Sequence, residues 1–206
     1  MTWRIAGTLL GGFGFMGRTA YPTVAHPARY PARMSADRPI PVTIAFARHG
    51  KTHPGSATGR DRDRLLMPRG ERQAKYLGEV FATLDAPPTI IIASPVTRAR
   101  QTAELIQQGL EVPLQFDEAL ASGAAASVVL EVALEACHAD PANVRPLIVG
   151  HNPTLEHLLA LLTLGPGGDY AAMRHVRTGE AFVLHIPDVA NPFSNAEVVG
   201  EIRGEE

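Results

Sequence analysis

From residue 41 onward, short apolar runs alternate along the chain with longer segments of helical periodicity. The runs at 88–94 and 145–150 are apolar at consecutive positions, which is typical of strands buried on both faces of a parallel sheet. A third run, at 41–47, is rich in β-branched residues, and the segment 70–84 carries apolar residues at three- and four-residue spacing, as amphipathic helices do. This alternation of strands and helices predicts an α/β sandwich with three layers and a mostly parallel sheet.

The remaining elements are predicted in the same way. We expect Gly109 to end one helix, and we expect Asn152 to cap another helix that has Pro153 at its first position. The expected helices lie at 96–110, about 125–138 and 153–164, and the expected strands lie near 112–116, within 180–188 and within 197–202.

The first forty residues differ from the rest. They contain five arginines, one acidic residue and four prolines, and they do not resemble a hydrophobic core. We expect residues 1–40 to be a disordered extension or sequence upstream of a start at Met34, and residues 41–206 to form one domain. The alternative is a signal peptide within residues 1–25, in which case the protein is exported rather than cytoplasmic.

The amino-acid composition limits which classes of molecule the protein is expected to bind. The formal net charge of −2 offers no concentrated basic field, so we expect neither a nucleic acid nor a membrane as partner; the oligomeric state stays open. Outside the N-terminal segment, no stretch approaches the roughly 20 apolar residues of a membrane span. Cys137 is the single cysteine, which excludes an intrachain disulfide, and it lacks the loop and arginine of a cysteine phosphatase.

Polar residues follow three of the predicted strands: Arg-His-Gly at 48–50, Ser-Pro-Val-Thr-Arg at 94–98 and Gly-His-Asn at 150–152. The carboxyl ends of parallel strands meet at one edge of a sheet, so two histidines and two arginines should converge there, next to helix N-termini. Guanidinium donors match the geometry of phosphate oxygens, and the glycine after the first histidine would let a ligand approach the backbone. These residues predict a phosphate-binding site.

The same motifs resemble those of a known family. In order, the chain contains ARHGKT, DRDRLLMPRGERQA, ASPVTRARQTAEL, VGHNPTLEHLLALL and RTGEAF. They resemble the histidine phosphatase superfamily, also called phosphoglycerate mutase-like, and most closely its small bacterial SixA-type phosphohistidine phosphatases. The resemblance covers residues 41 to about 186. It implies the phosphoglycerate mutase-like fold and a hydrolase of phosphoric monoesters or phosphohistidine. The short connections between the predicted elements leave no room for a large cap.

The resemblance also implies roles for individual residues. His49 matches the nucleophile that takes the phosphoryl group, Arg48 and Arg98 match phosphate-binding arginines, and His151 matches the second histidine that contacts the transferring group. The two nearby guanidiniums should discourage protonation of His49, which would keep it neutral and nucleophilic. No metal and no cofactor are expected.

The sequence leaves alternatives open for the general acid and for further contacts with substrate. Glu118 is the first candidate for the general acid, its neighbour Asp117 is the rival, and a solvated loop carboxylate is the alternative to both. Lys51, Thr52 and Arg64 follow the nucleophile on a loop and are candidates for contact with substrate.

We expect the substrate to be phosphohistidine on a signalling protein. A small phosphoester, such as a sugar or nucleotide-linked phosphate, is the alternative within enzymes, and a phosphate-binding module without turnover is the alternative outside them. A mutase is disfavoured, because re-donating the phosphoryl group requires a closed site that excludes water.

Overall fold

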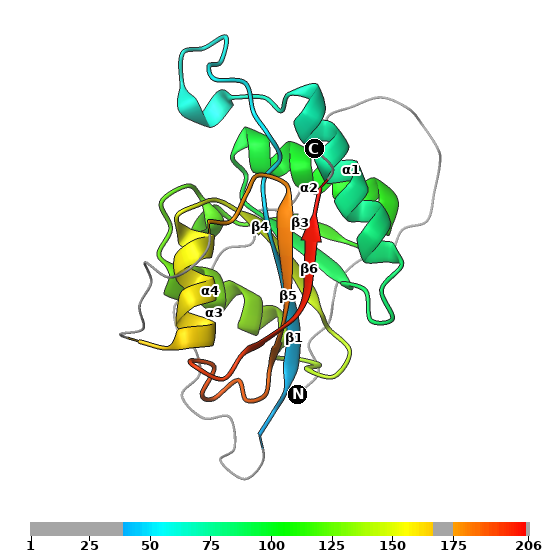
Figure 1. The fold of residues 1–206 in the computed structure, drawn as a ribbon, viewed down its shortest axis with the longest axis vertical. Coiled ribbons are helices and arrows are strands. Elements are labelled where there is room, and N and C mark those ends of the chain that lie inside the picture. The colour runs from blue at the N-terminus through cyan, green and yellow to red at the C-terminus, as the bar shows by residue number, and fades with distance from the viewer. Residues whose placement is uncertain (1–38, 167–174, 205–206) are drawn as a thin grey trace.

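The computed structural model describes residues 39–166 and 175–204 (Figure 1). The expectations for the N-terminal extension, for a signal peptide and for a start at Met34 therefore lie outside the described residues.

Six strands form one sheet in the order β3-β2-β4-β1-β5-β6. The first four in this order are mutually parallel, whereas β5 runs antiparallel to both β1 and β6. The mostly parallel sheet is thus confirmed, with an antiparallel pair at one edge. The strands are β1 Val42–Arg48, β2 Ile90–Ala93, β3 Leu114–Phe116, β4 Pro146–Gly150, β5 Glu180–Ile186 and β6 Glu197–Arg203.

Four helices cover the two faces of the sheet, which confirms the predicted three-layer sandwich (Figure 1). Helices α1 (Pro68–Ala82) and α2 (Thr97–Leu110) pack on one face, and α3 (Ala126–Cys137) and α4 (Thr154–Leu164) pack on the other. Two short 3-10 helices, η1 (Asp61–Asp63) and η2 (Glu118–Leu120), lie in the connections.

The alternation of side chains along β1 explains how this strand is held. Ile44 and Phe46 belong to the apolar cluster with α3 and α4, whereas Ala45 and Ala47 belong to the cluster with α1 and α2. Burial of each large apolar side chain contributes about 2 kcal/mol. The strand that leads into Arg48 is therefore anchored on both faces.

Gly109 does not end α2, contrary to the prediction. The helix ends at Leu110, and Glu111 follows in the left-handed region at φ 55°, where its N–H donates to the Gln107 carbonyl. Gly109 instead lies where α1 and α2 approach closely, because a Cβ there would come within 3.0 Å of the Gly78 carbonyl carbon. The glycine is required by helix packing and not by helix termination.

Asn152 does not cap α4, which is a second correction. Pro153 takes the N-cap position, and no side chain caps the helix. The Asn152 amide donates instead to Glu156 Oε1 at 2.7 Å and to the Val176 carbonyl at 2.9 Å. Asn152 therefore ties the start of α4 to the segment that leads into β5.

The connections at the C-terminal edge of the parallel strands are short. Within the described ranges, only η1 and loops join β1 to α1, and only η2, α3 and loops join β3 to β4. No inserted domain covers that edge in this part of the chain. None of the described helices is long and apolar enough to cross a membrane.

Candidate active site

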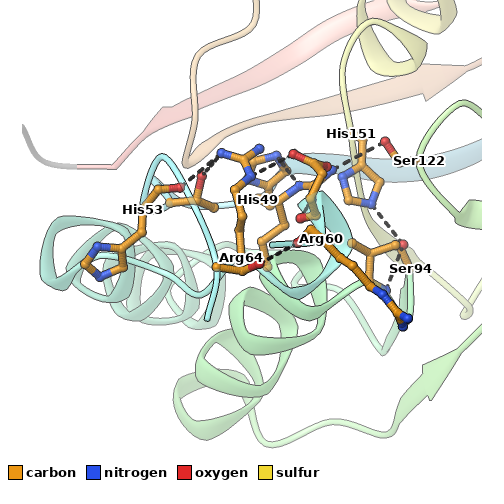
Figure 2. A network of polar contacts seen from close by, with 12 residues as sticks. His49, His53, Arg60, Arg64, Ser94, Ser122 and His151 are labelled. Carbon is orange, nitrogen blue, oxygen red and sulfur yellow. Dashed lines mark hydrogen bonds and ion pairs between the residues drawn. The ribbon is translucent and has the colours of Figure 1, made fainter. Parts of the chain in front are cut away.

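Two histidines meet at the carboxyl ends of neighbouring strands. His49 directly follows β1 and His151 directly follows β4, and the paired register of these strands sets Arg48 opposite Gly150. Their ring centroids lie 5.3 Å apart, and both residues are buried. Figure 2 shows the two imidazoles within one polar network. The convergence predicted from the strand ends is present.

The hydrogen bonds of His49 define the state of its ring. Nδ1 lies 2.8 Å from the Gly50 carbonyl, an acceptor, so Nδ1 carries the proton. Nε2 accepts from Arg98 Nε at 3.2 Å. The partners therefore fix the tautomer with a lone pair on Nε2, which is the atom that faces the centre of the site.

Burial is the largest cause that lowers the pKa of His49, which falls to about 4. The hydrogen bond to the Gly50 carbonyl opposes this shift, and the positive charges of Arg98 and Arg48 add to it. The imidazole is thus held neutral at physiological pH. The expected effect of the arginines has the right sign, but loss of hydration contributes more.

His151 is held in the same neutral state. Burial first, and then repulsion by a charged His49 and by Arg98, lower its pKa to about 3. Its Nε2 lies 2.9 Å from the Ser94 hydroxyl at the end of β2, whereas its Nδ1 is buried without a hydrogen-bond partner (Figure 2). A buried polar atom without a partner is costly, and a phosphoryl ligand could satisfy it.

Arg98 enters from the first turn of α2 and is almost fully buried. Besides its contact with His49, it donates through NH1 to the Asp61 carbonyl and to Asp61 Oδ2, each at 3.1 Å, and through NH2 to the Ser122 hydroxyl at 3.4 Å. Thr102, one turn on, donates to the Arg98 carbonyl at 2.7 Å and accepts from Gly50 N–H at 3.0 Å. Thr102 thus links the helix to the loop that carries the nucleophile candidate.

Asp61, in η1, is a site residue that sequence reasoning missed. Its carboxylate bridges two arginines, with Oδ1 at 2.8 Å from Arg64 Nε and Oδ2 at 3.1 Å from Arg98 NH1. Partial desolvation raises the pKa of Asp61, but the charges of Arg98 and Arg64 outweigh it and leave the pKa below its usual value. The only available sequence signal is the spacing of Asp61 three residues before Arg64.

Arg48 contacts other residues than Arg98 does. Its NH1 donates to the Val176 carbonyl at 2.7 Å and lies 3.3 Å from His175 Nε2, while its Nε is buried without a partner. His175 in turn pairs with Glu156. The sequence around His175 shows no pattern that indicates these contacts, because they join residues far apart in the chain.

Gly50 has a different role from the one expected. A Cβ at this position would lie 2.5 Å from the Gly70 carbonyl oxygen, and a Cβ at Gly70 would lie 2.1 Å from the Lys51 carbonyl oxygen. The absence of a side chain at this position therefore admits the backbone of α1. It thereby packs the first turn of α1 against the loop after β1.

The remaining predicted residues are spread around the site. Thr52 is buried, and its hydroxyl accepts from Arg64 NH1 at 2.8 Å, so these two support each other. Lys51 is exposed. Glu118 is exposed at the start of η2, whereas Asp117 is buried and its Oδ1 accepts from Ala119 N–H at 2.8 Å. Of the two acidic candidates, Asp117 is occupied as a cap of η2.

Neither a metal cluster nor a thiolate is found in the described part of the chain. Residues 39–166 and 175–204 contain no grouping of three or more His, Cys, Asp or Glu that could hold a metal ion. Cys137 is buried in α3, and burial raises the pKa of its thiol to about 12.

Comparison with known proteins identifies the family of the chain. The model of the histidine phosphatase superfamily (branch 1) matches residues 44–128. An uncharacterized protein of Mycobacterium tuberculosis is 32% identical over 117 residues, which cover 56% of this chain and 70% of the relative.

Solved structures share the fold. A protein from Nakamurella multipartitia assigned as a SixA phosphohistidine phosphatase is 25% identical, with a TM-score of 0.65, and the match covers 82% of this chain and 100% of that one. Mycobacterial glucosyl-3-phosphoglycerate phosphatase is 15% identical, with a TM-score of 0.61 and coverage of 81% and 100%. These matches show that the chain shares its fold with these proteins. The chain belongs to the histidine phosphatase superfamily.

Proposed function

We propose that the chain is a metal-independent phosphatase that transfers the phosphoryl group of its substrate to Nε2 of His49 and then to water. The observation that carries this proposal is the orientation of His49, whose Nδ1 bonds to the Gly50 carbonyl at 2.8 Å and whose Nε2 faces Arg98 at 3.2 Å. A pKa of about 4 leaves Nε2 unprotonated at neutral pH, so its lone pair can attack phosphorus once the substrate takes the place of the hydrogen bond from Arg98.

The first step forms a bond between His49 Nε2 and phosphorus while the bond from phosphorus to the leaving group breaks. A water oxygen then bonds to phosphorus, the phosphorus–Nε2 bond breaks with its electron pair returning to Nε2, and inorganic phosphate leaves. Arg98 and Arg48 would offset the charge on the phosphoryl oxygens, and the unpartnered Nδ1 of buried His151 would contact one of them. The carboxylate of Asp61, which now holds Arg98, would yield to the phosphate.

Glu118 is the proposed proton donor to the leaving group. Asp117 is bound to the backbone of η2, and the two arginines beside Asp61 keep that carboxyl ionised at neutral pH. Glu118 is exposed and free of such contacts among the described residues. A leaving imidazole needs little acid assistance, so the contribution of Glu118 should be larger for phosphoester substrates.

The proposed substrate is phosphohistidine on a signalling protein in the cytoplasm, with residues 41–206 as the catalytic domain. Two observations support it: the similarity to SixA structures, and a strand edge that no inserted domain covers in the described ranges. A small phosphoester is the alternative, which the same open edge would admit.

Hydrolysis of para-nitrophenyl phosphate by the wild type and by His49→Ala tests the catalytic part. We expect turnover by the wild type and a loss of about 10⁴-fold or more in the variant, since no other group supplies the nucleophile. Equal rates from the two proteins would rule out His49 as the nucleophile, and no turnover by either protein would favour a phosphate-binding module without turnover.

A panel of phosphohistidine proteins and small phosphoesters tests the substrate. The proposal requires higher kcat/KM for the phosphohistidine proteins. A wide preference for the small esters would overturn this choice of substrate while leaving the catalytic proposal intact.

A further inference from the structure

A cleft of about 510 Å³ adjoins the site on the side of Arg48. It lies between the first turn of α1, the segment before β5 and the end of β6. We call it the cationic cleft because five of its lining side chains are basic and one is a carboxylate: Arg48, Lys51, Arg69, Arg177, Arg203 and Glu180.

The single lining carboxylate is already used within the protein. Glu180 is buried, its Oε2 accepts from Arg177 N–H at 2.7 Å, and its Oε1 pairs with Arg203 Nε at 3.0 Å. Arg203 also pairs with Glu201 at 2.9 Å. Glu180 therefore pairs with the Arg203 side chain and the Arg177 backbone, and its charge also acts on Arg48, so one carboxylate is shared among several basic residues.

Two of the exposed basic residues in this lining are Lys51 and Arg69. Both are exposed, and neither forms a hydrogen bond or ion pair with any residue that the structure describes. The backbone of Lys51 is nevertheless fixed, because its N–H donates to Gln73 Oε1 at 3.0 Å and its carbonyl accepts from Met67 N–H at 2.8 Å. The ammonium of Lys51 and the guanidinium of Arg69 thus line a cleft in which basic side chains outnumber carboxylates.

We propose that the cationic cleft binds a second anionic group, a carboxylate or a phosphate, of the same substrate molecule whose phosphoryl group reaches His49. Arg48 connects the two places, because it lines the cleft and directly precedes His49 in the chain. The volume of about 510 Å³ lies within the range of roughly 300–1,000 Å³ typical of small-ligand sites and exceeds what one phosphate fills. The inference rests on the proposed function and narrows its substrate to molecules with a further negative charge near the phosphoryl group.

Substitution of Arg69, which lines the cleft, tests the proposal. The variants are Arg69→Ala and Arg69→Glu, and the matched control is Arg72→Glu, an exposed arginine on the same helix that does not line the cleft. Two pairs of substrates distinguish the sources of the anion. One pair consists of phosphohistidine peptides flanked by Asp and Glu or by Asn and Gln, and the other of 3-carboxy-4-nitrophenyl phosphate and para-nitrophenyl phosphate.

We expect Arg69→Ala to lower kcat/KM about two- to fivefold, and Arg69→Glu to lower it further, for at least one of the substrates with the second anion. The loss should lie in KM rather than kcat and should shrink with added salt, since the contact is made in the ground state and is exposed. An effect on the acidic peptide alone assigns the anion to protein side chains, and an effect on the carboxylated ester assigns it to a small phosphoester.

Equal effects of Arg69→Glu within each substrate pair, or a matching effect of Arg72→Glu, would overturn the proposal. Turnover of para-nitrophenyl phosphate by the wild type reports separately on the proposed function. Calorimetric titration of the same peptides into His49→Ala protein, with and without Arg69→Glu, measures affinity without turnover. The cleft is therefore tested whether or not the wild type hydrolyses these substrates.

Discussion

Acidification should destabilise the folded protein through His49 and His151, because both are buried as neutral imidazoles. In the unfolded chain a histidine takes up its proton near pH 6.5, whereas in the folded protein these two have pKa values of about 4 and about 3. Their contribution to stability is therefore complete above pH 6.5 and is lost as the pH falls towards 4. Between pH 7.5 and pH 5.0 the loss is about 2 kcal/mol for each histidine, or about 4 kcal/mol for the pair.

Urea unfolding at the two pH values measures this loss directly. The double variant His49→Gln/His151→Gln should lose much less free energy of unfolding than the wild type over the same interval, because the titrating groups are gone. His157→Gln is the control, since His157 is exposed on α4 and should leave the wild-type pH dependence unchanged. An equal loss of free energy of unfolding in the wild type and in the double variant would show that the two histidines do not cause the acid destabilisation.

Three further substitutions follow from the geometry of the site. Arg98→Lys should lower kcat/KM for para-nitrophenyl phosphate about a hundredfold, because an ammonium cannot reproduce the donors that reach His49, Asp61 and Ser122 together; a loss below fivefold would contradict this. Asp61→Asn should make inorganic phosphate a two- to fivefold tighter competitive inhibitor, since the exposed carboxylate competes for Arg98, and weaker inhibition would count against that competition. Gly50→Ala should lower the free energy of unfolding by about 1–3 kcal/mol in urea titrations, because its Cβ would lie 2.5 Å from the Gly70 oxygen; an unchanged midpoint would show that the contact relaxes.

Residues on regular elements could be predicted from the sequence. The apolar runs of β1, β2 and β4 defined a parallel sheet, and the parallel order placed His49, Arg98 and His151 at one edge without any knowledge of distances. The pattern was sufficient because strand ends and helix starts have few alternative positions relative to a buried sheet.

Contacts that depend on how a loop folds back onto the rest of the chain could not be predicted from the sequence. Asp61 reaches Arg98 only because the loop after β1 folds back, with Thr52 bridged to Leu66. The sequence suggested other roles for Gly50 and Gly109, and only the approach of a neighbouring helix backbone reveals why a Cβ would be crowded there. Sequence periodicity carries no information about such close approaches between distant segments.

The claim that His49 carries the phosphoryl group is tested most directly by rapid-quench mass spectrometry during turnover of para-nitrophenyl phosphate. We expect one phosphoryl group per protein, located on the peptide that contains His49, stable in base and lost in acid. His49→Gln should show no such group. Turnover by the wild type with no phosphorylated His49, or with the phosphoryl group on another residue, would show that His49 is not the nucleophile.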